Sequence, residues 1–320
     1  MSSNSESGIV RTVLGDLPSD KLGHTQCHEH IFLEKGPSYL SNPALCMDDY
    51  GRSLSELREY FEAGGRTIVD AQPVFCGRNA EVLRKLSAES GVGIVAVTGF
   101  HKKLFIEPNA PVLTASEDEL KDLYVSEIRD GMLTLSGERS SAKAGIVKVA
   151  YEKDGLEDRQ YGRMFAAAAE TSKITGAPVM VHTEKDTDIF VLIRYFEDRR
   201  VPADRIIICH LDRTRYDVQY HLELLKTGCF LCYDSINRLK YLSEEEELAL
   251  IATVRDAGYV KQIVLSLDTT NQRLRAYGAK DMGLDFILKS YIPLLSERGF
   301  TDEEIRYMCQ TNAHKALSFK

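Results

Sequence analysis

Residues 144–183 read AGIVKVAYEKDGLEDRQYGRMFAAAAETSKITGAPVMVHT, and the pattern of apolar residues in this stretch indicates the fold class. It holds two short apolar runs, 144–150 and 177–183, on either side of a helical stretch from about 158 to 175 that Gly176 closes. Neither run has a polar face, so each predicts a strand that is covered by helices on both faces of its sheet. The stretch is therefore a predicted strand–helix–strand unit of a parallel sheet.

The same pattern continues in both directions along the chain. Six further apolar runs predict strands at 22–30, 66–72, 92–99, 205–211, 228–234 and 261–268. Helical stretches separate them, with capping-box patterns at Ser53–Glu56, Ser243–Glu246 and Thr301–Glu304, a helix end at Gly64-Gly65, and a further helix at about 186–199. Eight such units in about 300 residues favour a closed (β/α)8 barrel, an α/β fold, over an open sheet.

Two features complete the predicted organisation. Residues 8–19 predict a short N-terminal hairpin ahead of the first barrel strand. No linker rich in Gly, Pro or Ser divides the chain, so we expect a single domain over residues 1–320.

The amino-acid composition and the absence of certain sequence patterns argue against several classes of protein. The chain of 320 residues has 40 Lys+Arg, 48 Asp+Glu, a net charge of −8 and 43% hydrophobic residues, which is typical of a globular protein without a basic footprint for nucleic acid. The N-terminal MSSNSESGIV lacks the pattern of a secretory signal, and no apolar run is long enough to span a bilayer. Seven scattered cysteines, including Cys229 and Cys232, are expected to be buried, reduced thiols. We therefore expect a cytoplasmic protein that binds neither nucleic acid nor membrane.

Potential metal ligands stand at the ends of the predicted strands, where (β/α)8 barrels carry their active sites. They are His28 and His30 in the first strand, Lys148 in the fourth, and His182, His210 and Asp268 in the fifth, sixth and eighth. Imidazole and carboxylate ligands suit zinc, and also manganese, iron and cobalt. Four His and one Asp exceed what one open catalytic site uses, and they suffice for two ions bridged by an anionic group.

The other four histidines have weaker claims to a site. His24, His221 and His314 are expected to be structural, because they do not lie at the ends of predicted strands. His101 directly follows the third strand on the catalytic side, which leaves both a structural role and a place in the substrate pocket open.

At these residues the sequence resembles the phosphotriesterase-like lactonase family of the amidohydrolase superfamily. The resemblance covers nearly the whole chain and rests on five segments in the family's order: His28-Glu29-His30, GIVKVA, VMVHT, ICHLDRT and LSLDTT. It implies one metal on His28, His30 and Asp268 and another on His182 and His210. It also implies that Lys148 is carboxylated by carbon dioxide and bridges the two ions. A hydroxide between the ions would attack the substrate, and Asp268 would accept its proton and pass it to the leaving oxygen.

The loops after the last three strands are unusually basic for an acidic protein. The six cations are Arg213, Arg215, Arg238, Lys240, Arg273 and Arg275. Arg and Lys bind phosphate strongly, so they indicate an anionic substrate, although any one of them could be an ordinary surface charge. The segments GFHKKLF and TTNQRLRAYG resemble the branch that acts on phosphorylated sugar lactones, in which Lys240, Arg273 and Arg275 would hold the phosphate, with His101 or Lys102 nearby and Arg213 in the substrate pocket.

The leading hypothesis is thus a binuclear metal hydrolase, with zinc as the first choice of metal. It would open the lactone ring of a small anionic sugar derivative, which the resemblance implies to be phosphorylated. Its enzymatic alternative is a lactonase of the acyl-homoserine lactone type or a phosphotriesterase that acts on uncharged esters. A barrel that has lost its activity and serves as a scaffold is the alternative outside catalysis, but all six expected positions are retained. A homodimer is possible, and nothing in the sequence identifies its interface.

Overall fold

The computed structural model describes residues 8–320. Residues 1–7, which the predicted domain of 1–320 includes, lie outside the described residues. Eight parallel strands follow one another around a barrel in chain order from β3 to β10. They are β3 (His24–Glu29), β4 (Gly65–Asp70), β5 (Gly93–Gly99), β6 (Ala144–Tyr151), β7 (Val179–Thr183), β8 (Ile206–Cys209), β9 (Phe230–Tyr233) and β10 (Ile263–Leu265). Each matches a strand predicted from an apolar run, so the predicted barrel is confirmed.

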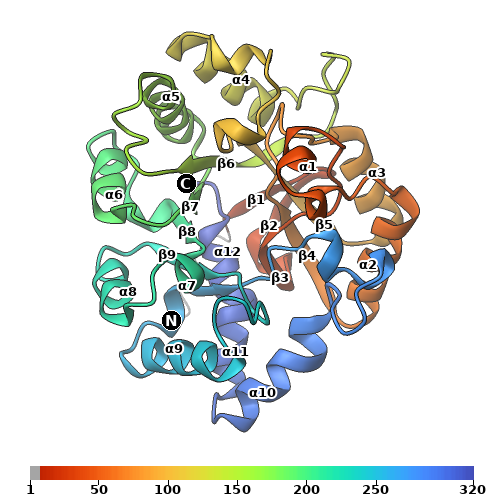
Figure 1. Ribbon diagram of the computed structural model, residues 1–320, viewed down its shortest axis with the longest axis vertical. Coiled ribbons are helices and arrows are strands. Elements are labelled where there is room, and N and C mark those ends of the chain that lie inside the picture. The colour runs from red at the N-terminus through yellow and green to blue at the C-terminus, as the bar shows by residue number, and fades with distance from the viewer. Residues whose placement is uncertain (1–7) are drawn as a thin grey trace, which may run out of the picture.

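Helices form a ring around the strands (Figure 1). They are α1 (Pro37–Ser41), α2 (Tyr50–Glu62), α3 (Ala80–Ser90), α4 (Glu117–Arg129), α5 (Arg159–Thr175), α6 (Ile189–Glu197), α7 (Leu211–Thr214), α8 (Val218–Leu225), α9 (Glu244–Asp256), α10 (Ile292–Glu297), α11 (Asp302–Arg306) and α12 (Asn312–Ala316). None of the helices within residues 8–320 combines the length and the apolar character that crossing a bilayer requires.

The observed ends of the helices can be compared with the predicted capping residues. Ser243 and Thr301 both form capping boxes, at the starts of α9 and α11, and Gly176 ends α5 in the left-handed conformation, as predicted. The box predicted at Ser53 is wrong, because α2 starts one turn earlier at an Asp49 cap. The Ser53 hydroxyl instead donates to the carbonyl of Ile31 at 2.7 Å, which ties α2 to the chain leaving β3.

The barrel closes between its first and last strands through a side chain. Glu29, at the end of β3, is fully buried, and its carboxylate accepts hydrogen bonds from the Ser266 hydroxyl at 2.7 Å and from the backbone N–H groups of Leu267 and Thr269 at 2.8 and 3.1 Å. The Asp268 N–H also donates to the His28 carbonyl at 3.1 Å. These bonds fix the segment after β10 against the end of β3.

Alternate residues of the strands fill the barrel interior. Cys27, Val95, Ile146 and Met180 belong to one buried cluster there. The predicted hairpin is present as β1 (Ile9–Thr12) and β2 (Gly15–Pro18), paired antiparallel, and Val10 joins the same interior cluster. The hairpin therefore contributes to the interior packing of the barrel.

Cys229, which directly precedes β9, and Cys232, within β9, are both buried as predicted. Cys229 packs in the cluster between the barrel and its helices, whereas Cys232 packs inside the barrel. Both are free and buried. They therefore cannot act together as a redox pair or as two ligands of one ion.

Candidate metal centre and substrate cavity

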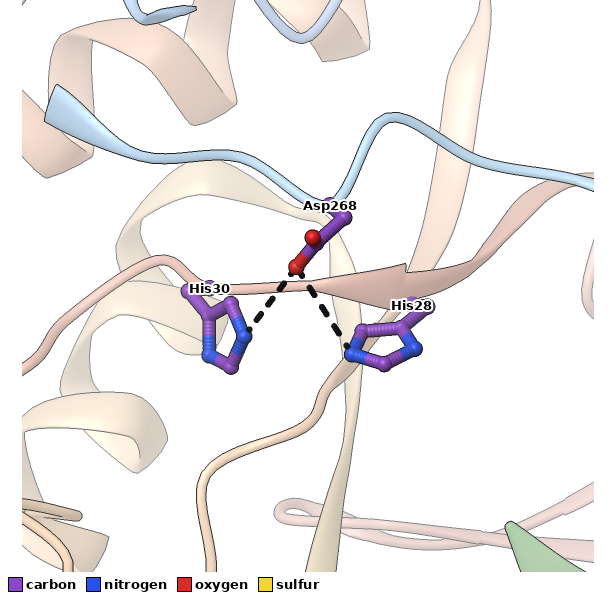
Figure 2. Close-up of side chains that lie close together, drawn as sticks. All are labelled: His28, His30 and Asp268. Carbon is purple, nitrogen blue, oxygen red and sulfur yellow. Dashed lines mark ion pairs between the residues drawn. The ribbon is translucent and has the colours of Figure 1, made fainter. Parts of the chain in front are cut away.

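Strand β3 and the segment after β10 bring together the first group of predicted ligands (Figure 2). One carboxylate oxygen of Asp268 lies 3.8 Å from Nε2 of His28 and 3.4 Å from Nε2 of His30. His28 is fully buried, and its Nε2 has no hydrogen-bond partner among the described residues. Two imidazole nitrogens and a carboxylate oxygen thus converge on one point, although Asp268 lies far from both histidines in the sequence.

In the second group of predicted ligands, a ring nitrogen of His182 faces a ring nitrogen of His210 at close distance. Nδ1 of His182 lies 2.8 Å from Nε2 of His210. On its far side, His182 Nε2 donates to the Glu184 carboxylate at 3.0 Å, and His210 Nδ1 donates to the Asp234 carboxylate at 2.7 Å. A neutral imidazole has one N–H, so these carboxylates leave a lone pair on each of the two facing nitrogens. Two lone pairs that face each other repel, and a cation bound by both nitrogens would remove this repulsion.

The electrostatics keep His30, His182, His210 and Asp268 free of protons. His28 differs, because burial alone would lower its pKa but Cys209 and Asp234 raise it to about 10. Burial lowers the pKa of His30 to about 4 and that of His182 to about 3, and it holds the pKa of His210 well below the ordinary value. Neutral imidazoles are the form that binds metal ions. For Asp268, burial alone would raise the pKa, but Arg238 and Arg213 hold it well below its usual range, so this ligand is ionised.

Lys148 is fully buried, which excludes a side chain that reaches solvent. Its ammonium donates to the Ala71 carbonyl at 2.6 Å. After burial, the charge of Lys148 is among the causes that lower the pKa values of His30 and His182, one ligand from each group, so the amine stands near both. Burial lowers the pKa of Lys148 itself to about 8, which makes the neutral amine accessible near neutral pH.

Two of the predicted ligands sit on backbone that side chains rarely adopt. His210 has φ +71° and Asp268 has φ +48°, both in the left-handed region. Such conformations cost of order 1–3 kcal/mol and concentrate at functional sites. Among the predicted ligands, His210 and Asp268 are therefore held in positions that extended strand backbone would not give them.

A cavity of about 290 Å³ opens over the ligands. Its lining includes His30, His182 and Asp268, together with the predicted substrate residues His101, Lys102, Arg213 and Lys240. Arg238 also lines it, as do Gln72, Glu184 and Tyr241. His101 therefore belongs to the pocket, the alternative that the sequence left open, while His221, bonded to Tyr233 and the Arg215 carbonyl, is structural.

Most of the cavity cations already have protein partners. Arg213 lies 2.6 Å and Arg238 3.2 Å from the same oxygen of Asp268, and Lys102 lies 2.6 Å from Glu184. The Lys240 ammonium is 4.7 Å from the ring centre of Tyr241, and no ion pair joins it to a carboxylate of residues 8–320. Lys240 is thus the cation most available to a substrate.

Arg273 and Arg275, which were predicted to hold a phosphate, do not line the cavity over the ligands. Arg275 lies outside the cavity, because its guanidinium pairs with Glu59 at 2.5 Å and with Asp285 at 3.1 Å. Arg273 lines an adjoining hollow of about 370 Å³, and it donates to the carbonyls of Ile236 and Asn237 at 2.6 and 3.1 Å. It therefore braces the loop that carries Arg238 and Lys240.

Three residues of this centre carry no role in the sequence analysis. Asp234 and Glu184 accept the imidazole N–H groups described above, and Glu29 closes the barrel. A signal existed for Asp234, which ends a predicted strand as the ligands do. Glu184 stands two residues after His182, and Glu29 stands between two ligands, so their positions in the sequence do not distinguish them from ordinary neighbours.

Comparison with known proteins agrees with this architecture. A sequence profile of the phosphotriesterase family matches residues 8–317. The chain belongs to the phosphotriesterase family. A relative described as a phospho-furanose lactonase, from Mycoplasmopsis synoviae, is 32% identical, with 98% of this chain and 93% of the relative covered.

Two solved structures of phosphotriesterase-family relatives are similar over the whole barrel. An amidohydrolase from Mycoplasma synoviae has a TM-score of 0.92 at 31% identity, covering 98% of this chain and 93% of that one. The phosphotriesterase homology protein of Escherichia coli, solved with phosphate in its active site, has a TM-score of 0.84 at 26% identity, covering 93% of this chain and 100% of that one.

Proposed function

We propose that this phosphotriesterase-family protein is a binuclear metal-dependent hydrolase that opens the ring of a small phosphorylated sugar lactone. The observation that carries the proposal is the lining of one cavity, which combines the ligand groups His30, His182 and Asp268 with the cations Arg238 and Lys240. The phospho-furanose lactonase relative supports this substrate class by similarity.

The donor set fits two divalent ions. His28, His30 and Asp268 would hold one, and His182 and His210 the other, with zinc as the proposed metal and manganese, cobalt or iron as ions that the same ligands accept. When bound, the two ions would polarise the lactone carbonyl and lower the pKa of the attacking water. Lys148 would bridge them as a carbamate, formed when its neutral amine bonds to carbon dioxide and releases a proton.

The remaining steps belong to side chains of the cavity. Asp268 would take the proton from the attacking water and deliver it to the ring oxygen that leaves, with Arg213, 2.6 Å away, holding the carboxylate in place. Lys240 and Arg238 would bind the phosphate and so align the carbonyl. Arg273 would contribute indirectly, by bracing their loop.

Cavity size and polarity disfavour the enzymatic alternative. A volume of about 290 Å³ is at the lower limit for ligand pockets, and apart from Leu45, Phe105 and Tyr241 the lining is polar or charged. A long acyl chain would find little apolar surface there. An uncharged lactone or phosphotriester would leave Lys240 without a partner.

A matched pair of lactones, with and without the phosphate, tests the proposal on metal-loaded enzyme. We expect kcat/KM to be at least ten-fold higher for the phosphorylated lactone, because one charge-assisted hydrogen bond contributes about 1.5–3 kcal/mol. Preference for the uncharged lactone would favour the alternative. Hydrolysis of neither would refute the lactonase function.

A further inference from the structure

Asp234 lies between the two groups of ligands, on a strand to which the sequence analysis assigns none. It directly follows β9 and is fully buried. Its Oδ1 is 2.7 Å from Nδ1 of His210, and its Oδ2 is 3.2 Å from Nδ1 of His28. One carboxylate therefore contacts an imidazole from each half of the metal centre, whose ring centres are 4.6 Å apart.

The chemistry of the three groups indicates where the imidazole protons lie. His210 Nδ1 hydrogen-bonds to Asp234, whereas His28 Nδ1 lies 3.2 Å from Oδ2 without the alignment of a hydrogen bond. An ionised carboxylate has only acceptor sites, so an imidazole with one proton is favoured to place it on the Nδ1 that contacts Asp234. Each ring then has its lone pair on Nε2. Nε2 of His28 faces Asp268 at 3.8 Å, and Nε2 of His210 faces His182 at 2.8 Å, which are the directions of the two proposed ions.

We propose that Asp234 is a positioning residue shared by both metal sites, which sets the tautomer and orientation of His28 and His210 and so couples the loading of the two ions. This inference rests on the proposed binuclear centre and extends it. Asp234 itself touches neither ion nor substrate. Its role differs from that of Glu184, which contacts a single ligand, His182, from the outer side at 3.0 Å.

A competing role for Asp234 must be separated from this one. His28, Asp234 and Cys209 offer ligand atoms within 4.8 Å of one another, so the same carboxylate could instead ligate a third ion. The two roles predict different numbers of bound ions. A positioning role leaves two ions per chain, whereas a ligand role makes three.

The test is a titration of the metal-free protein with Zn²⁺ or Co²⁺ in competition with a chromophoric chelator. Orienting partners of metal ligands typically contribute 10- to 100-fold in affinity. In Asp234→Ala we expect both ions to bind 10- to 100-fold more weakly. In the matched control Glu184→Ala, which also removes a carboxylate, we expect that loss for one ion only. The spectrum of bound Co²⁺ assigns the change to one or both sites.

Three results would overturn the proposal: unchanged affinities in Asp234→Ala, a loss confined to one ion, or a wild-type protein that binds three ions and a variant that binds two. Should Asp234→Ala fail to fold, nitrogen NMR of the histidine-labelled, zinc-loaded wild-type protein replaces it. We expect protons on Nδ1 of both His28 and His210, and a proton on Nε2 of either would refute the role. Since all these readouts are independent of turnover, inactivity on lactones would refute the proposed function alone.

Discussion

The guanidinium of Arg213 lies 2.6 Å from the carboxylate of Asp268, although the two residues leave different strands of the barrel. Arg238 reaches the same oxygen at 3.2 Å. A carboxylate that is both a proposed metal ligand and a proposed proton acceptor is thus held by two cations that also line the substrate cavity. In the proposed mechanism, substrate binding and proton transfer would therefore depend on the same small network of side chains.

Replacing this carboxylate by an amide tests its role in proton transfer. We expect Asp268→Asn to lower kcat by about 10²–10⁴-fold with a much smaller change in KM, because proton transfer contributes chiefly in the transition state. Metal content must be measured in parallel, since the substitution also changes a proposed ligand. A metal-loaded variant with the turnover of the parent would assign proton transfer to another group.

Removal of the lysine amine tests the bridge. Lys148→Ala should abolish hydrolysis and lower the bound metal below two ions per chain, because no anion would then join the two ligand groups. Elemental analysis of the purified variant measures this, and added short carboxylates should restore part of both properties. Full turnover in Lys148→Ala would end the carbamate hypothesis.

Formation of the carbamate should depend on pH in a defined direction. Burial lowers the pKa of Lys148 from 10.5 to about 8, so the amine is protonated below about pH 8 and neutral above it. Only the neutral amine reacts with carbon dioxide. At fixed dissolved carbon dioxide, the rate at which metal-free protein is activated by Zn²⁺ should rise about ten-fold per pH unit up to about pH 8 and then level off. A rise that continues unchanged to pH 10 would contradict the lowered pKa.

The cations of the loops provide a matched pair of variants. Lys240→Ala should lower kcat/KM for a phosphorylated lactone by about 10- to 150-fold and leave the unphosphorylated lactone nearly unchanged. Arg275→Ala is the control, because its guanidinium pairs with Glu59 and Asp285 outside the cavity. We expect it to change kcat/KM by less than about three-fold and stability by at most about 1 kcal/mol, since Lys289 still pairs with Asp285 at 2.6 Å. Equal losses in both variants would argue against a phosphate site at Lys240.

Features that depend on neighbouring residues could be predicted from the sequence, whereas contacts between distant residues could not. Apolar runs and strand ends are local patterns, so the strands and the position of His28, His30 and Asp268 at one end of the barrel could be predicted before any contact was known. Their grouping in one site was implied by the family resemblance, and the structure brings the three together. Arg275 could not be placed in this way, because its position depends on Glu59, which is 216 residues away in the sequence. The oligomeric state, the location in the cell and the bound metal stay predictions, because no contact within one chain depends on them.

The closure of the barrel through Glu29 has a consequence for the order of events during biosynthesis. Glu29 is synthesised 237 residues before its hydrogen-bond partner Ser266. A nascent chain that stops short of Ser266 to Thr269 would expose the end of β3 and an uncompensated carboxylate. The proposed first metal site would therefore assemble only after Asp268 has been synthesised, and a chain that ends earlier would hold only part of the proposed ligand set.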